Sequence, residues 1–533
     1  MFSFIRKPWF LAIATGVLLW AAWSPNGFAP LLFIALIPLL FIEEKITKAK
    51  RNGATVSLFK WSYLSLFVFN LLTTWWIYFA SDWGMAMAII LNTLFMATVF
   101  QLFHITRLRL GDKIGYLSLI LYWTAFEYLH LNWSLSWTWL TFGNGLAAFY
   151  GWIQWYEFTG VLGGSLWILL SNVFLFSIIK APQHYNYKKL FAWLMLIILP
   201  VCLSKIIESQ YNVNNQKQKS VVVVQPNIDP YNEKFSGMSS RDQLNKMLQL
   251  ASTVVDSATD YVVCPETALP DGIWENELQT HPQIVTIRAF MQGYPKLNFI
   301  TGLVSNRLYT STEEHPATAR KFTDEDAYYD SYNTGMQLDS SKRIQLHHKS
   351  KLVIGVETLP FPFLEKIAIN LGGASGSLGT QPSPSVFFSA DSTGVAPVIC
   401  YESIYGEYVT EYVKKGAQAI FIITNDGWWR DTPGYHQHSE YARLRAIETR
   451  RDIARSANTG ISCFINQLGA IAQPTKWWTD DVIQQNIHLN TKLTFYVKYG
   501  DYLGVIAAVG SMLLLLGFAG NKLKERKSGR NNS

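Results

Sequence analysis

Charged residues and cysteines are both scarce in this chain of 533 residues. Asp, Glu, Lys and Arg make up 16% of it, against about 25% in an average soluble domain. Four Cys are too few for a small disulfide-stapled fold. Aromatic residues reach 15%, which excludes a disordered chain, because such chains have few aromatics and much charge. The length exceeds that of one hydrophobic core and predicts more than one domain.

Several common motifs are also missing. The chain has no G-x-S-x-G nucleophile elbow, no P-loop and no G-x-G-x-x-G turn. The histidine pairs 347–348 and 436–438 have no carboxylate or Cys partner at metal-ligand spacing. We therefore expect neither a metal site nor a cofactor.

Long apolar runs fill the first 207 residues and return near the C-terminus. Most approach the ~20 residues that cross a bilayer core. The runs are 9–23, 29–43, 58–81, 83–106, 114–133, 152–180, 190–207 and 503–520. Buried helices of a soluble protein are the alternative, but eight such runs favour a multi-pass α-helical membrane domain. The first run could be a signal peptide, yet a second run follows within a few residues and favours a retained helix.

Basic residues cluster in alternate gaps between these runs. The gaps 24–28 and 134–151 carry none. The positive-inside rule then places both termini in the cytoplasm and the segment 208–502 on the other side. The basic C-terminal tail is therefore interpreted as a topology signal, and no nucleic-acid partner is expected.

These patterns predict four parts. They are a membrane domain of about seven helices at 1–207, a soluble domain at 208–502, a C-terminal membrane helix at 503–520 and a basic cytoplasmic tail at 521–533.

The soluble segment alternates short β-branched runs with helical patterns. This alternation predicts an α/β layered fold. Strands are expected near 219–224, 261–264, 298–303, 397–400 and 418–424, and helices near 239–257 and 436–455. We expect the charged stretch 307–329 to be a surface excursion and the Gly-rich stretch 372–377 to be a flexible loop.

The outer gap 134–151 is rich in aromatic residues. Trp137 and Trp139 could lie at the lipid surface, where amphipathic rings are favoured. Two interpretations stay open: an interfacial belt, or a lipid-facing wall of an active site.

Three reactive side chains follow predicted strands. Glu266 comes just after the strand that ends at Pro265, Lys349 follows two histidines at another strand end, and Cys400 ends a third strand. A Cys thiolate can act as nucleophile, a carboxylate as its general base and an ammonium as stabiliser of the thiolate and of an oxyanion. If the chain turns sharply after Cys400, the N–H of Tyr401 is a second oxyanion donor. Such a set predicts acyl transfer without a metal.

Each of these residues also has an ordinary interpretation. A lone Cys on an apolar strand is usually a small buried hydrophobe, and a lone Lys is usually a solvated charge. Cys264 competes with Cys400, because it lies two residues before Glu266 and strand alternation would put both on one face.

In combination, these residues resemble the Glu-Lys-Cys triad of the nitrilase, or carbon–nitrogen hydrolase, superfamily. The matching stretches are Pro265-Glu266-Thr267, Lys349, Cys400-Tyr401-Glu402, 424–429 and 445–462. A nitrilase-like domain between seven helices and one more is similar to the apolipoprotein N-acyltransferase family of the bacterial inner membrane. A Trp common in that family is missing near Lys234 and Phe235.

The resemblance implies a nitrilase-like α-β-β-α sandwich on the periplasmic side of the inner membrane. It implies that Glu266 is the general base, Lys349 the oxyanion stabiliser and Cys400 the nucleophile. Glu357 and Glu402 match further acidic positions near the triad. The implied reaction moves an acyl chain from a phospholipid, through a Cys thioester, to the α-amino group of a diacylglyceryl-Cys apolipoprotein. We expect a monomer that works without a cofactor.

Two other functions are compatible with the same residues. One is a membrane-tethered amidase or nitrilase that hydrolyses a small amide with the same triad. The other is a non-catalytic receptor or transport component with a decayed nitrilase domain, which the presence of all three triad residues disfavours.

Overall fold

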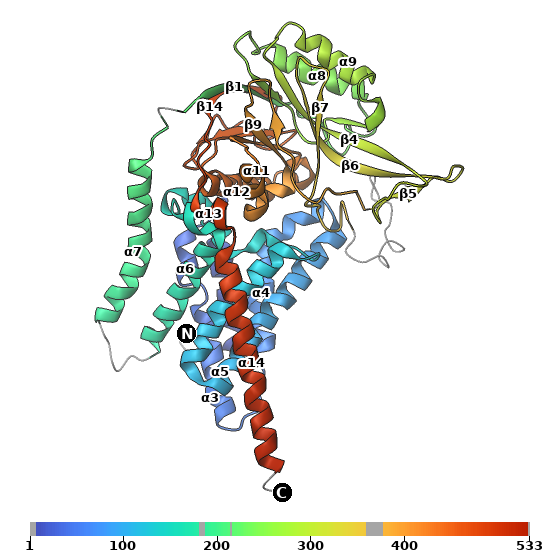
Figure 1. Cartoon of the computed structure of the whole chain (residues 1–533). Coiled ribbons are helices and arrows are strands. Elements are labelled where there is room, and N and C mark those ends of the chain that lie inside the picture. The colour runs from blue at the N-terminus through green and yellow to red at the C-terminus, as the bar shows by residue number, and fades with distance from the viewer. Residues whose placement is uncertain (1–6, 181–186, 214–215, 359–376, 531–533) are drawn as a thin grey trace. The chain divides into compact units, whose positions relative to one another are not determined.

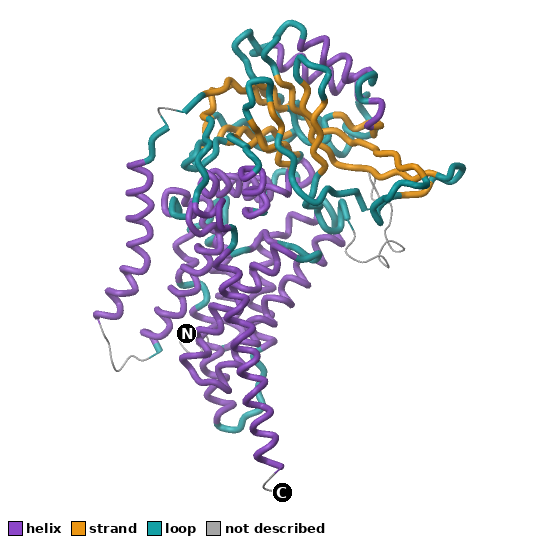
Figure 2. The backbone as a smooth tube through the Cα atoms, viewed as in Figure 1, coloured by secondary structure: helices purple, strands orange, loops and turns teal. Residues whose placement is uncertain are grey.

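The computed structural model describes residues 7–180, 187–213, 216–358 and 377–530 (Figure 1). The chain forms two compact units. One comprises Met1–Trp75, Met85–Ser209 and Tyr499–Ser533, and the other comprises Trp76–Gly84 and Gln210–Lys498. Within the described ranges every strand belongs to the second unit, and the first is helical (Figure 2). The expected loop at 372–377 lies outside the described residues except for Ser377.

The first unit contains a helix in each of the eight apolar runs. Its helices are α2 (Pro8–Ala21), η1 (Ala29–Phe33), α3 (Ile37–Arg51), α4 (Phe59–Thr74), α5 (Asp82–Asn132), η3 (Thr138–Leu140), η4 (Phe142–Trp152), α6 (Tyr156–Ile179), α7 (Tyr187–Gln210) and α14 (Tyr502–Arg530). The short helix η2 (Trp75–Phe79) follows α4. Helix α5 is two helical segments joined at Gly111, whose φ of 83° interrupts the helix in the basic gap between two apolar runs.

Three helices are long and apolar enough to cross a membrane: α5, α6 and α7. Two shorter apolar helices, Pro8–Ala21 and Tyr502–Phe518, accompany them. The number of spans and their orientation stay predictions.

The second unit is built on two sheets. The first has the order β14-β1-β2-β4-β6-β5, with β3 paired to β4 and β7 paired to β6, and the second has the order β13-β12-β11-β10-β9-β8. The strands of the first sheet are β1 (Gln218–Gln225), β2 (Tyr261–Val263), β3 (Leu269–Trp274), β4 (Asn298–Thr310), β5 (Arg320–Lys321), β6 (Ala327–Leu338), β7 (Ile344–His348) and β14 (Asp481–His488). Those of the second are β8 (Phe387–Phe388), β9 (Gly394–Ile399), β10 (Ala419–Thr424), β11 (Ile453–Ala457), β12 (Cys463–Ile465) and β13 (Ile471–Ala472). The helices of this unit are α8 (Ser240–Ser252), η6 (Glu275–Glu277), α9 (Pro282–Met291), η7 (Cys400–Ile404), α11 (Gly406–Lys414), η8 (Asp426–Trp429), α12 (Pro433–Thr449) and α13 (Phe495–Tyr499).

Strand alternation builds four layers from these elements. In β1, Val221 and Val223 pack between the sheets against residues of β9 and β10, while Val222 and Val224 pack against α8 and α9. The second sheet likewise packs its other face on α11 and α12. Strands that are buried on both faces have continuous apolar sequences, which explains the unbroken apolar runs in β1 and β10. The predicted α-β-β-α sandwich is confirmed (Figure 1).

One local prediction is wrong in its bounds. The helix expected at 436–455 ends at Thr449, because Arg450 adopts a left-handed conformation (φ 52°) and 453–457 forms β11. The helix begins earlier, at Pro433, where the Thr432 side chain caps it. The stretch 307–329 is mostly exposed, as expected of a surface excursion, and its ends are regular, because β4 and β6 stay paired out to Thr310 and Ala327 as a long hairpin.

Gly302 in β4 connects this fold to the candidate site. A Cβ there would lie 2.5 Å from the Thr267 nitrogen and 2.7 Å from the Glu266 Cα. We expect Gly302→Ala to destabilise the second unit by about 1–3 kcal/mol, because overpacking must displace the backbone that carries Glu266. Denaturant unfolding measures the loss in the free energy of unfolding.

The matched control is Gly293→Ala, because a Cβ there meets only the Phe290 carbonyl oxygen, at 4.0 Å. Equal effects of the two substitutions would contradict this account of Gly302.

Candidate active site

Cys400 lies on a strained turn at the end of β9. Its φ is 48°, a left-handed conformation that costs a non-Gly residue about 1–3 kcal/mol. The chain passes directly from the strand into the 3-10 helix η7. The sharp turn expected after Cys400 is therefore present, and the side chain is 8% exposed. The role of the Tyr401 N–H as oxyanion donor stays a prediction.

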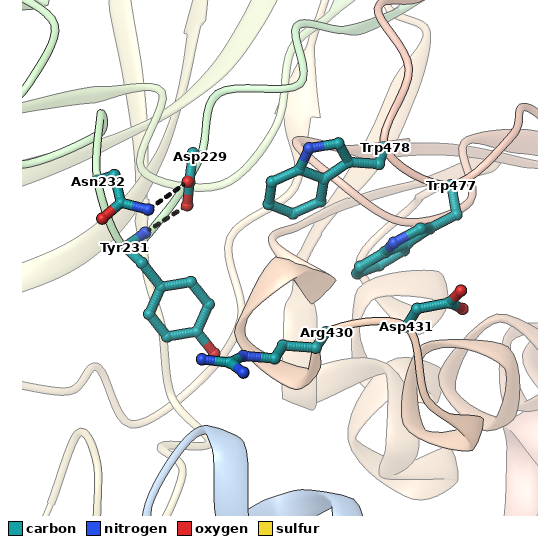
Figure 3. Close-up of a pocket in the computed structure, with 7 residues that line it drawn as sticks. All are labelled: Asp229, Tyr231, Asn232, Arg430, Asp431, Trp477 and Trp478. Carbon is teal, nitrogen blue, oxygen red and sulfur yellow. Dashed lines mark hydrogen bonds between the residues drawn. The ribbon is translucent and has the colours of Figure 1, made fainter.

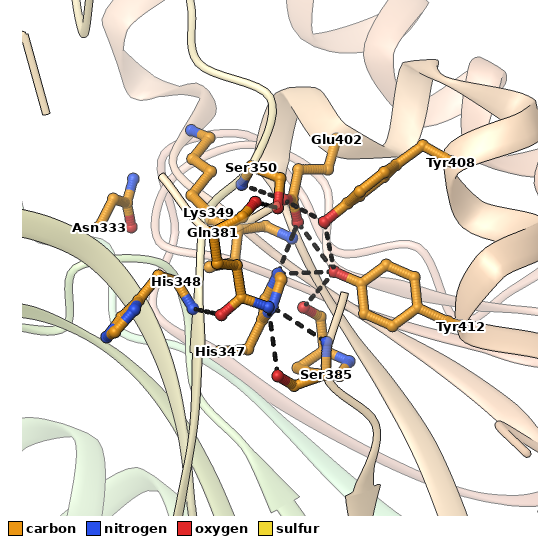
Figure 4. Close-up of polar contacts among 12 residues, drawn as sticks. Asn333, His347, His348, Lys349, Ser350, Gln381, Ser385, Glu402, Tyr408 and Tyr412 are labelled. Atoms are coloured by element: carbon orange, nitrogen blue, oxygen red, sulfur yellow. Dashed lines mark hydrogen bonds and ion pairs between the residues drawn. The ribbon is translucent and has the colours of Figure 1, made fainter. Parts of the chain in front are cut away.

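Glu402, two residues after Cys400, is the centre of a polar network (Figure 4). It is fully buried. Its carboxylate accepts hydrogen bonds from the N–H groups of Ile399 (2.9 Å) and Ser350 (2.7 Å) and from the hydroxyls of Tyr408 (3.0 Å) and Tyr412 (3.1 Å), and it lies 3.2 Å from His347 Nε2. Burial alone would raise the pKa of Glu402, but His347 and the two N–H groups outweigh it and lower the pKa. Glu402 thus ties the end of β9 to the residue after Lys349.

Lys349, the residue just after β7, lies between two carboxylates. Its Nζ donates to Glu266 Oε1 at 2.9 Å and to Glu357 Oε1 at 2.8 Å. Asn333 Nδ2 donates to the same two oxygens, at 2.7 and 3.0 Å. Glu357 is held in turn by the Val353 N–H at 2.8 Å. The structure therefore brings Glu266, Lys349 and Glu357 together, although 83 residues separate Glu266 from Lys349.

The charges of this cluster act on Cys400. Burial alone would lower the pKa of Lys349, but Glu266 and Glu357 hold it well above its ordinary value. Burial raises the pKa of the Cys400 thiol, and the charge of Glu266 raises it further, while Lys349 opposes both. These effects favour the neutral thiol form of Cys400 and the charged form of Lys349.

A second buried lysine lies at the same place. Lys234 is 2% exposed and its Nζ donates to the Glu266 carbonyl oxygen at 3.0 Å. Burial lowers the pKa of Lys234 to about 8, although Glu266 and Cys400 oppose the shift. Sequence reasoning missed this residue, because a lone Lys after a strand carries no motif. Only the fold identifies Lys234, because it buries the ammonium group away from solvent.

A third set of groups supports Cys400 from behind. Asp426 Oδ2 accepts from Arg455 Nη2 at 2.7 Å, and its Oδ1 lies 2.9 Å from His438 Nδ1. His438 Nε2 lies 3.2 Å from the Cys400 carbonyl oxygen, which also accepts from Ser403 Oγ at 2.7 Å. Burial alone would raise the pKa of Asp426, but Arg455 and His438 lower it to about 2.

Cys264 does not share the site with Glu266. Its side chain is fully buried in the cluster that packs against α8 and α9. The strand β2 ends at Val263, and Thr267 has a positive φ of 45°, so strand alternation stops before Glu266. The expectation that both residues lie on one face is therefore wrong.

Trp137 and Trp139 lie in the other unit. Their rings stack with centroids 5.7 Å apart at 9°. Trp139 is 1% exposed, so the prediction that it faces lipid is wrong, because its ring packs inside the protein. Trp137 is partly exposed and its lipid-facing role stays a prediction.

The geometry defines a class of protein. A buried Cys on a strand-to-helix turn beside a Glu–Lys pair in an α-β-β-α sandwich is the arrangement expected of a carbon–nitrogen hydrolase domain, and residues 221–492 match the carbon–nitrogen hydrolase family. Residues 15–174 match the family described as the apolipoprotein N-acyltransferase N-terminal domain.

Relatives match along almost the whole chain. The apolipoprotein N-acyltransferase of Chlorobaculum tepidum is 30% identical over 95% of this chain and 97% of its own length. Those of Geobacter metallireducens and Pasteurella multocida are each 26% identical, over 96% and 95% of this chain and 95% and 94% of their own lengths. The chain belongs to the apolipoprotein N-acyltransferase family.

Asp426→Asn tests the support behind Cys400. Breaking a buried ion pair leaves Arg455 uncompensated, so we expect a loss of about 3–5 kcal/mol in the free energy of unfolding at pH 7. Because the folded-state pKa is depressed to about 2, the stabilisation is present above the pKa of an unfolded Asp and is lost as pH falls through the folded pKa. The difference between wild type and variant should shrink below about pH 4. Denaturant unfolding across this pH range measures it.

Asp480→Asn is the control, because Asp480 pairs with Lys246 at the surface. An exposed pair should contribute less than about 1 kcal/mol. A pH-independent loss for Asp426→Asn would contradict the assignment of the charge.

Proposed function

We propose that this protein transfers an acyl chain from a membrane phospholipid, through a thioester on Cys400, to the α-amino group of the N-terminal diacylglyceryl-Cys of apolipoproteins. The observation that carries the proposal is the buried Lys349 ammonium between Glu266 and Glu357, because the charges of Lys349 and Glu266 act on the Cys400 thiol. Family membership supports the same acceptor.

In the first step Glu266 takes the proton of the Cys400 thiol as its sulfur attacks an ester carbonyl of the phospholipid. Lys349 and the Tyr401 N–H stabilise the oxyanion of the tetrahedral intermediate. The intermediate then expels the lysophospholipid alkoxide, which takes the proton from Glu266, and the acyl group remains on sulfur as a thioester.

In the second step the acceptor α-amine attacks the thioester. Glu266 takes a proton from the nitrogen, the C–S bond breaks, and the thiolate recovers its proton from Glu266. An amide forms and the enzyme returns to its starting state. Each half-reaction needs one base, and Glu266 serves both.

The membrane unit gives a reason for these substrates. The acyl donor and the lipidated acceptor both reside in a bilayer, and α5, α6 and α7 have the length and composition to cross one. We propose the bacterial inner membrane as the location, with 1–207 and 503–520 in the bilayer, 208–502 in the periplasm and 521–533 in the cytoplasm. This orientation rests on the distribution of basic residues. We propose a monomer.

Intact mass spectrometry tests both half-reactions. The purified chain should carry a fatty-acyl mass on Cys400, and a diacylated lipopeptide should gain that mass as the protein loses it. Cys400→Ala should carry no adduct, whereas Cys264→Ala should keep it, because Cys264 packs toward α8 and α9. If neither the protein nor the lipopeptide gains an acyl mass in the presence of phospholipid, the acyltransferase proposal fails, and hydrolysis of small amides becomes the function to assay.

Glu266→Gln and Glu357→Gln form a matched pair, since both carboxylates bind Lys349 Nζ. Loss of the base should slow acylation of Cys400 by about 10²–10⁴-fold in Glu266→Gln. Glu357→Gln keeps the base and should lose less. Single-turnover acylation measures both rates, and a larger loss in Glu357→Gln would contradict the assignment of Glu266.

A further inference from the structure

A pocket of about 380 Å³ opens in the second unit away from the contacts of the triad. Three loops form it: one after β1, one after η8 and one between β13 and β14. Its lining includes Asp229, Tyr231, Arg430, Asp431, Trp477 and Trp478. Figure 3 shows the guanidinium of Arg430 ending beside the Tyr231 hydroxyl, with the indole of Trp478 across the opening. Cation, aromatic faces and carboxylates thus meet in one cavity.

Arg430 supplies the anion-binding part. Its guanidinium carbon lies 4.8 Å from the ring centroid of Phe79 and 5.5 Å from that of Tyr231. Among the residues that the structure describes, it forms no ion pair with a carboxylate. The guanidinium lies over two rings and beside the Tyr231 hydroxyl, and its remaining N–H groups belong to a planar fork that can bind phosphate with two hydrogen bonds (Figure 3).

The backbone of Arg430 is strained. Its φ of 52° and ψ of −166° fall in a region that is essentially reserved for Gly and costs other residues about 1–3 kcal/mol. Its backbone contacts, from its N–H to Gly427 O and from the Thr432 N–H to its carbonyl, need no side chain. Gly would therefore suit the fold better, and the strain indicates that the side chain serves binding.

The opposite wall suits a cationic amine. Trp478 has a φ of 58°, a second strained position, and is 42% exposed. Trp477 is fixed by stacking on Tyr435, with centroids 4.3 Å apart, and the Tyr435 hydroxyl donates to Asp431 Oδ1 at 3.0 Å. Indole faces beside a carboxylate bind ammonium and quaternary ammonium groups.

The pocket is close in sequence to both the catalytic centre and a membrane span. Arg430 lies four residues after Asp426, a separation of at most about 14 Å. Phe79, which Arg430 contacts, belongs to this unit and lies three residues before α5, a candidate span. This proximity along the chain favours a ligand of membrane origin that carries a charged end.

We propose that this pocket binds the zwitterionic headgroup of the acyl-donor phospholipid, with its phosphate on Arg430 and its amine against Trp478, Trp477 and Asp431. This inference rests on the proposed function in taking a phospholipid as donor. It adds the part of the donor that the protein recognises and the residues that recognise it.

The first test measures acylation of the full chain by three donors with the same acyl chains: phosphatidylethanolamine, phosphatidylglycerol and diacylglycerol. Loss of the phosphate contact in Arg430→Gly should lower kcat/KM for both phospholipids about tenfold or more. Trp478→Gly should lower kcat/KM for phosphatidylethanolamine more than for phosphatidylglycerol. Diacylglycerol, which has no headgroup, should lose least in both. The control is Arg241→Gln, which removes an exposed charge on α8 and should leave the preference among the three donors unchanged.

Both Gly variants relieve strain, so their melting temperatures should not fall, and a loss of activity cannot then be assigned to misfolding. A loss that is equal for all three donors, or no loss for phosphatidylethanolamine, would overturn the proposal.

The second test separates the pocket from the proposed function. Calorimetric titration of the full chain with glycerophosphoethanolamine should show binding that Arg430→Gly abolishes. If the wild type binds this headgroup but no phospholipid acylates Cys400, the proposed function fails and the pocket stands. If inorganic phosphate binds as tightly as glycerophosphoethanolamine, the pocket is a simple anion site and the proposal of a zwitterionic headgroup is wrong. If neither compound binds, the pocket is not a headgroup site.

Discussion

The buried ammonium of Lys349 is the interaction on which the candidate site depends. A charge removed from water is stable only when opposite charges and hydrogen bonds replace its solvation. Here Glu266 and Glu357 supply the charges, and Asn333 bridges the same two oxygens. This requirement fixes the loop after β2, strand β6 and the loop after β7 at one point, and the charges of Glu266 and Lys349 act on Cys400.

Two further networks hold the backbone of Cys400 in place. Glu402 accepts from the N–H of Ser350, just after β7, and from that of Ile399, at the end of β9. The Asp426–His438–Arg455 cluster contacts the Cys400 carbonyl oxygen through His438. A left-handed backbone at Cys400 persists only where the surroundings over-determine it. The strain of the turn and the buried polar groups behind it are therefore parts of one design.

Much of the fold followed from local pattern. Apolar runs predicted the helices of the first unit, and β-branched runs predicted β1, β2, β4, β9 and β10, because burial on both faces demands such composition. The end of α12 did not follow, since the left-handed conformation of Arg450 depends on the sheet that it enters. Cys264 was misplaced because a strand pattern cannot show where Pro265 and Thr267 turn the chain away.

The sequence alone determined the division into an apolar helical part and an α/β part, and it predicted Glu266, Lys349 and Cys400 as a reactive set at strand ends. Composition and periodicity are local properties, so they can be read along the chain. Only the tertiary structure showed that Lys234 lies at the site and that Glu402 binds the backbone before Cys400 instead of contacting Lys349. It also showed that Arg430 and Trp478 line the same pocket. Burial and charge pairing between residues far apart in sequence arise when the layers pack, and no local pattern records them.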